Sequence, residues 1–189
     1  MNILRQALAA VRLLLVMTVL LGIAYPLVIT GVAQVIAPFQ ANGSRLTTSQ
    51  GHVVGSALIG QSFDGPQWFQ SRPSVSDYSG QTSGGSNLSP ASVEQSDARA
   101  TREADLRAAN PDAVGPVPED ALTASASGLD PHISPAYALW QVPRVSKSRN
   151  IDPDRLAALI TAATEPAPLG FLGQDGVNVT RLNLALAAG

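Results

Sequence analysis

The chain has 189 residues, of which 45% are hydrophobic and only 14% are charged, and its formal net charge is −2. A nucleic-acid-binding protein needs a cationic face, and twelve basic residues, one of them a lysine, against fourteen acidic ones exclude that class. No cysteine is present, which excludes disulfides, thiolate metal sites and thiol catalysis. Residues 1–44 contain only two charged side chains, Arg5 and Arg12, so the sequence is not that of a simple soluble globule.

Residues 1–38 are predicted to form a short cytoplasmic N-terminus and a membrane anchor. From Leu13 to Pro38, 26 consecutive residues carry no charge, and as a helix they would extend about 39 Å, enough to cross a bilayer with some tilt. Arg5 and Arg12 precede this segment, so the positive-inside rule places the N-terminus in the cytoplasm. Residues 39–189 are then an external, periplasmic or extracytoplasmic domain.

A cleaved signal peptide is the alternative interpretation of the same segment, because Gly31-Val32-Ala33 offers a small-x-small cleavage site. The apolar region of a signal peptide usually has about 7–15 residues, so the length favours a retained anchor. Within the anchor, Thr18, Gly22 and Pro26 follow one another at one-turn spacing and are candidates for packing against another membrane helix.

The first half of the external domain, which we expect to be mixed α/β, contains one strand, a long loop and a helix. Residues 52–59 are apolar and β-branched between glycines, which predicts a strand. Residues 71–92 contain eight serines and no sustained periodicity, so they form a long loop of the kind that is often functional. Ser92 and Gln95 have capping-box spacing and predict a helix that ends at residue 110, followed by a proline-rich linker.

The second half is predicted to contain two more helices and a final strand. One helix begins after Ser134, is bent or interrupted at Pro143, and has basic residues suited to its C-terminus: Arg144, Lys147 and Arg149. The next helix spans residues 152–165, with apolar residues at helical spacing. Residues 177–186 alternate between apolar and polar residues, with one phase change, which predicts a strand with a bulge near residue 180.

The residue inventory points away from an enzyme. His132 follows Asp130, and Ser127 or Ser134 would complete a nucleophile, base and orienting group, so a signal-anchored external hydrolase remains the alternative function. No Gly-x-Ser-x-Gly motif, metal-ligand cluster or phosphate-binding loop accompanies these residues, so we assign no catalytic or metal-binding residue. A single apolar helix also cannot enclose a polar pathway, so this chain alone is not a transporter.

Several segments, taken together, resemble the C subunit of the bacterial Kdp-type potassium-transporting ATPase. They are residues 55–61, 69–74, 83–88 and 123–135, with shorter matches at 141–145 and 178–183. The resemblance covers essentially the whole chain, and the 13-residue segment 123–135 is its most specific part. It implies a non-catalytic accessory subunit of a four-subunit inner-membrane complex that uses ATP to import potassium.

The resemblance also implies partners: a channel-like A subunit, a P-type ATPase B subunit, a small F subunit and the lipid bilayer. The family is described as a catalytic chaperone that raises the ATP affinity of the B subunit, which implies no cofactor of its own but an ATP shared with that subunit. ATP is cytoplasmic and the domain is predicted outside, so we favour a role in assembly and stability. Our candidates for the partner interface are Arg72, Ser83, Gly84, Gly85, Asn87, Asp130 and His132.

Overall fold

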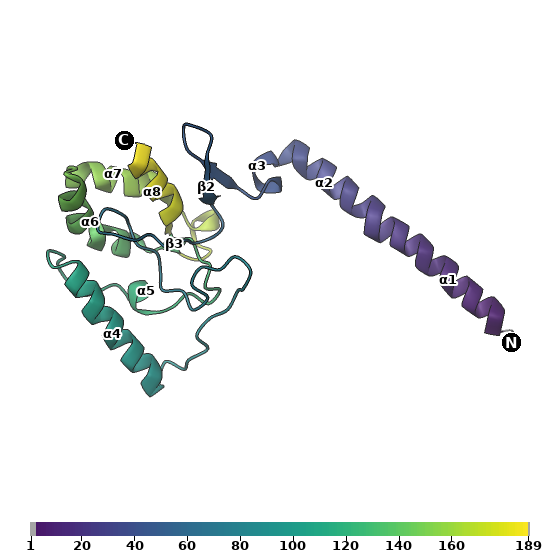
Figure 1. Cartoon of the computed structure of the whole chain (residues 1–189), viewed down its shortest axis with the longest axis horizontal. Coiled ribbons are helices and arrows are strands. Elements are labelled where there is room, and N and C mark those ends of the chain that lie inside the picture. The colour runs from purple at the N-terminus through teal and green to yellow at the C-terminus, as the bar shows by residue number, and fades with distance from the viewer. Residues whose placement is uncertain (1–2, 189) are drawn as a thin grey trace. The chain divides into compact units, whose positions relative to one another are not determined.

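The computed structural model describes residues 3–188, and the chain divides between Ser44 and Arg45 into two compact units (Figure 1). The first unit is one long helix followed by a short one, and its elements are α1 (Ile3–Val19), a π-helical turn η1 (Leu20–Ala24), α2 (Tyr25–Ile36) and α3 (Pro38–Ala41). Residues Ile3–Ile36 form the one helix in the described chain that is long and apolar enough to cross a membrane, and none of its side chains is buried. Of the helix predicted over residues 13–38, the part up to Ile36 is confirmed; the helix begins earlier, at Ile3, and ends before Ala37.

The π-helical turn lies immediately before a proline. The N–H of Tyr25 donates to the carbonyl of Leu20, five residues earlier, and Pro26 follows with no N–H to donate. An inserted π turn is a common way for a helix to accommodate a missing hydrogen bond. Thr18 and Gly22 share a face, because a Cβ at Gly22 would lie 3.8 Å from Thr18 Cγ2. Packing of Thr18, Gly22 and Pro26 against a partner helix stays a prediction.

The second unit begins with a hairpin and a long irregular segment. Strands β1 (Arg45–Thr47) and β2 (Val53–Ser56) pair antiparallel, so the predicted strand is present but shorter than residues 52–59. Residues 57–92 form no helix or strand, as predicted for the part from residue 71. Helix α4 (Val93–Ala109) follows, and Ser92 Oγ accepts from the N–H of Gln95. The second half of the predicted capping box is not formed, because the N–H of Ser92 donates to the carbonyl of Ser89 instead.

The C-terminal half surrounds a small antiparallel sheet with strand order β3-β5-β4. Its elements in chain order are α5 (Glu119–Leu122), β3 (His132–Ile133), α6 (Pro135–Arg149), α7 (Pro153–Ala163), β4 (Thr164–Glu165), a 3₁₀ turn η2 (Pro168–Gly170), β5 (Gly176–Asn178) and α8 (Val179–Ala188). Helix α7 packs against both α6 and α8, and all three contact β5 (Figure 1). The mixed α/β class and the predicted helices are confirmed.

The predicted strand over residues 177–186 is wrong after Asn178, where α8 begins. Val179, Leu182 and Leu186 are at most 1% exposed and lie at i, i+3 and i+7, which is a helical face. Leu184 is only half-buried, so Leu182, Leu184 and Leu186 do not form one buried face, as they would in a strand with one side on the core. In a short apolar segment both periods fit, and packing against α7 decides between them.

Helix α6 is not interrupted at Pro143, which corrects one of the two expectations there. Proline removes the hydrogen bond to the carbonyl four residues earlier, that of Leu139. Leu139 is 51% exposed, so this carbonyl lies on the side of the helix that water can reach. Val142 and Val145, which precede and follow the proline along the chain, are buried in the core and hold the helix on both sides of it.

Candidate functional site

A buried arginine in α6 holds the segment that leads into the serine-rich loop. Arg144 is 7% exposed, and its Nη1 donates to the carbonyls of Pro66 (2.7 Å) and Trp68 (2.9 Å). Its Nε donates to Asn110 Oδ1 at 2.7 Å, and its Nη2 donates to Gln141 Oε1 at 2.6 Å. The prediction that Arg144 serves the helix C-terminus is therefore wrong. Burial lowers the pKa of Arg144, but a guanidinium remains charged, so these are charge-assisted hydrogen bonds.

Two buried amides hold the next two residues as a neighbouring strand would. Asn183 on α8 accepts from the N–H of Phe69 (2.9 Å) and donates to its carbonyl (2.8 Å). Gln141 on α6 does the same for Gln70, at 2.7 and 3.2 Å. Because each amide satisfies both backbone groups, Phe69 can be fully buried without belonging to a sheet. The role of Gln141 was missed; its signal is a polar residue at a core-facing helix position, within a segment that carries the family resemblance.

The segment 123–135 is the surface on which the serine-rich loop lies. The carbonyl of Ser127 accepts from the N–H of Gly84 (2.9 Å) and from Ser83 Oγ (3.1 Å). Gly128 has a φ of +68°, and a Cβ there would lie 2.9 Å from the carbonyl oxygen of Gly84, so only glycine allows this approach. Gly85 lies against Ala126 in the same way. Within the described chain, residues 83–85 of the loop therefore contact residues 126–128 of the same domain.

An ionic cluster of alternating charge lies beside this surface. Arg72 Nη1 is 3.3 Å from Asp130 Oδ2, and His132 Nδ1 is 3.5 Å from Asp130 Oδ1. On the other side of the imidazole, Nε2 is 3.0 Å from Glu165 Oε2, and Arg181 Nη1 is 3.1 Å from Glu165 Oε1. We call these five residues the ionic cluster. It connects the loop, the segment 123–135, β4 and α8, and its side chains are 25–43% exposed.

The sheet register explains how the imidazole reaches a carboxylate two strands away. His132 on β3 pairs with Asn178 on the central strand β5, and Glu165 on β4 pairs with Gly176 on that strand. A Cβ at Gly176 would lie 3.1–3.3 Å from atoms of the His132 side chain. The missing side chain at Gly176 therefore leaves the space across which His132 meets Glu165.

The pKa values of the central pair shift in opposite directions. Hydrogen bonding to Asp130 raises the pKa of His132 most; burial acts against this shift, and Glu165 adds to it. Burial would raise the pKa of Asp130, but hydrogen bonds from the ring and the N–H of His132, together with the charge of Arg72, outweigh burial and lower it. Both shifts favour the charged forms, so the two carboxylates stabilise the protonated form of His132 between them.

The predicted interface residues fall into two groups and one outlier. Arg72, Asp130 and His132 meet in the ionic cluster, whereas Ser83, Gly84 and Gly85 meet the turn at residues 126–127. Asn87 is exposed in a left-handed conformation (φ 53°) and joins neither group. Glu165 and Arg181 were missed, because only the sheet register and the C-terminal helix bring them to His132.

The cluster lacks the geometry of a hydrolase. Both ring nitrogens of His132 face carboxylates rather than a serine. Ser134 caps α6, with its hydroxyl donating to Asp120 and accepting from the N–H of Tyr137, and Ser127 Oγ accepts from the N–H of Leu129. Within residues 3–188 no group of three or more His, Asp or Glu side chains is arranged to hold a metal ion. What this arrangement can do is join segments and present charge at the surface.

Comparisons with known proteins agree with the resemblance in the sequence. The family model described as "K+-transporting ATPase, c chain" matches residues 7–188. A potassium-transporting ATPase KdpC subunit of Burkholderia orbicola is 51% identical over 181 residues, covering 94% of this chain and 93% of that protein. Those of Sorangium cellulosum and Myxococcus xanthus are 50% and 47% identical, covering 94% and 95% of this chain and 94% and 86% of those proteins. The chain therefore belongs to the KdpC family, the c chain of K+-transporting ATPases.

Proposed function

We propose that the chain anchors itself in the inner membrane by one span, with its N-terminus in the cytoplasm, and that its external domain assembles and stabilises the potassium pump. Its partners are the channel-like A subunit, the P-type ATPase B subunit and the small F subunit. The loop and the segment 123–135 cover the external potassium entrance of the A subunit. The ionic cluster presents its half-exposed charges at that contact.

One observation carries this proposal: the helix Ile3–Ile36 exposes apolar side chains around its whole circumference. Such a helix needs lipid or other membrane helices around it. The two arginines that precede the uncharged segment support an N-terminus in the cytoplasm, and in that orientation the 45–189 unit lies on the side opposite cytoplasmic ATP. This argues for assembly rather than for the alternative role, in which the chain raises the ATP affinity of the B subunit.

Deleting residues 45–189 separates the two roles. For an assembly role we expect a much lower yield of intact complex in detergent, while any complex recovered keeps its KM for ATP. For the alternative role the yield stays the same and the KM for ATP rises. Asp130→Ala is the matched point variant: complex yield should fall while turnover per complex is unchanged. Full yield with abolished turnover would contradict the proposal.

The orientation is tested with single cysteines, since the chain has none of its own. Val114 is 90% exposed in the second unit, so Val114→Cys should react with a membrane-impermeant maleimide on intact cells. The control is Gln6→Cys, near the N-terminus, which should react only after the membrane is permeabilised. The reverse labelling pattern would overturn the orientation.

A further inference from the structure

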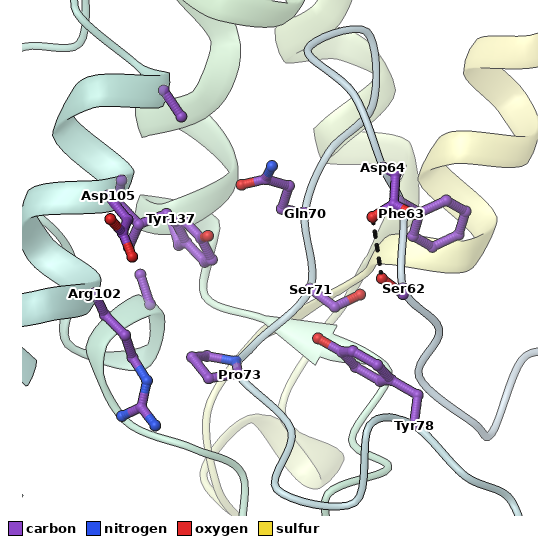
Figure 2. A pocket seen from close by; sticks show the side chains of 13 residues that line it. Ser62, Phe63, Asp64, Gln70, Ser71, Pro73, Tyr78, Arg102, Asp105 and Tyr137 are labelled. Atoms are coloured by element: carbon purple, nitrogen blue, oxygen red, sulfur yellow. Dashed lines mark hydrogen bonds between the residues drawn. The ribbon is translucent and has the colours of Figure 1, made fainter. Parts of the chain in front are cut away.

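A pocket of about 350 Å³ lies between the irregular segment and helices α4, α5 and α6, and its lining residues Ser71 and Pro73 flank Arg72 of the ionic cluster (Figure 2). Its walls come from residues 62–64, 70, 71, 73 and 78 and from the helices α4, α5 and α6. Aromatic rings of Phe63, Tyr78 and Tyr137 line it, and acidic side chains reach it from Asp64 and Asp105. The pocket therefore combines flat apolar surfaces with negative charge.

The Tyr137 hydroxyl gives the pocket an unused polar group. Tyr137 is 1% exposed, yet its Oη makes no hydrogen bond to any residue in the described part of the chain, and Figure 2 shows this oxygen directed toward the middle of the lining residues. Burial raises the pKa of this hydroxyl, so it stays neutral and can accept a hydrogen bond. Tyr137 Oη is not one of the fully buried atoms that lack a partner, so it reaches the space of the pocket, where an occupant can donate a hydrogen bond to it.

The charges at the pocket favour a cationic occupant. Asp105 has no ion pair within residues 3–188, and Asp64 only accepts a long hydrogen bond (3.5 Å) from Ser62 Oγ. Arg102 is the single cation among the lining residues, and its Nη1 is already bound to the carbonyl of Leu122 at 2.9 Å. Two carboxylates and one guanidinium leave an excess of negative charge beside an unpaired acceptor.

We infer that this pocket receives a lysine side chain from a partner subunit of the pump, an inference that rests on the function proposed above. The methylene groups would pack on the rings of Phe63 and Tyr78, and the ammonium would bind Asp105 and Tyr137 Oη, while Asp64 adds negative charge on the other side of the pocket. An ammonium is a compact charge with three donors, which suits acceptors on separate elements better than a planar guanidinium does. The chain's own lysine, Lys147, is paired with Asp112 at 2.9 Å, so the occupant comes from another chain.

Carbodiimide cross-linking of the assembled complex tests the inference directly. The reagent activates a carboxylate, a neighbouring lysine amine attacks it, and an amide forms while the reagent leaves as a urea carrying the carboxylate oxygen. We expect mass spectrometry to find Asp105 joined to a lysine of a partner subunit, and this product to be lost in Asp105→Asn. The matched control is Asp97→Asn, an exposed aspartate of the same helix that does not line the pocket. A partner product that persists in Asp105→Asn, or that is lost equally in Asp97→Asn, overturns the inference.

Assembly measurements give a second, independent readout. Tyr137→Phe removes only the hydroxyl, and Asp105→Asn only the charge, so each should weaken binding of this chain to the other subunits about three- to tenfold, and less so in high salt. Wild-type affinity in both variants would overturn the inference. So would a carbodiimide reaction of the assembled complex in which Asp105 is joined to added n-butylamine and not to a partner lysine. If the wild-type chain does not associate with pump subunits at all, the proposed function itself fails. If it associates but gives no Asp105 product, only the lysine site fails.

Discussion

The sharpest stability prediction concerns Arg144. Replacing it with methionine keeps much of the side-chain volume but removes the donors to Pro66, Trp68, Asn110 and Gln141. The buried carbonyls and amide oxygens then lose their charged partner. Hydrogen bonds to charged groups each stabilise by about 1.5–3 kcal/mol, and breaking a buried charged network typically costs about 3–5 kcal/mol in total. We expect Arg144→Met to lower the free energy of unfolding of the domain by about 4 kcal/mol.

Tryptophan fluorescence of the full chain in detergent measures this effect. Both tryptophans, Trp68 and Trp140, lie in the 45–189 unit, so the signal reports the domain and not the anchor. For a domain of this size, about 4 kcal/mol corresponds to a fall in Tm of about 8–16 °C. Arg144→Lys keeps the charge but not the planar fork of donors, so it should lose at least half as much.

The matched control is Arg107→Met in α4. Arg107 is exposed and pairs with Glu103 on the same helix at 3.0 Å, an interaction that stabilises by well under about 1 kcal/mol. Its Tm should stay within about 2 °C of the wild type. If Arg144→Met also stayed within that range, or if both variants lost equal stability, the argument that buried side-chain hydrogen bonds hold residues 66–70 would be refuted.

Three further predictions concern the ionic cluster and the loop. Because the pKa of His132 is raised in the folded state, protonated His132 stabilises the domain fully below the ordinary pKa near 6.5, and this stability is lost as pH rises through the folded pKa. The free energy of unfolding of the wild type should therefore fall by about 1 kcal/mol, relative to that of His132→Gln, between about pH 5 and about pH 9. If the free energies of the two proteins changed in parallel with pH, this prediction would be contradicted. The lowered pKa of Asp130 adds stability above its ordinary value, which should be lost in acid as pH falls through the folded pKa, a loss that Asp130→Asn abolishes in the same titration. Gly128→Ala should destabilise by about 2 kcal/mol more than Gly115→Ala, since both glycines have positive φ but only Gly128 has neighbours within 4 Å; equal Tm values would refute this.

The sequence predicted the elements that carry their own end signals. Ser92, Ser134 and Asp152 each accept a hydrogen bond from the first turn of a helix, as their positions indicated. The elements that were missed or wrongly predicted have no capping residue or other local signal at their ends. The strands β3 and β4 have two residues each and exist only through pairing with β5. The helix after Asn178 had an ambiguous period that tertiary packing resolved.

The candidate site was predictable only in part, because its contacts join distant segments. The resemblance pointed to Arg72, Asp130 and His132, and the fold adds that they contact one another. Glu165 and Arg181 could not be added from the sequence, since their approach depends on the register of a three-stranded sheet. The roles of Arg144 and Gln141 in α6 were missed because the sequence does not indicate which distant backbone groups they bind.

The way Phe69 is held constrains the order in which the domain can mature. Its backbone partner, Asn183, is 114 residues further along the chain. At about 5–20 residues per second of synthesis, the early segment waits roughly 6–23 s before the helix that completes its hydrogen bonds has been made. During this time we expect the segment around Phe69 and the serine-rich loop that follows it to be accessible to proteases and to chaperones. A nonsense mutation that removed only the last ten residues would leave the backbone of Phe69 without both of its hydrogen-bond partners.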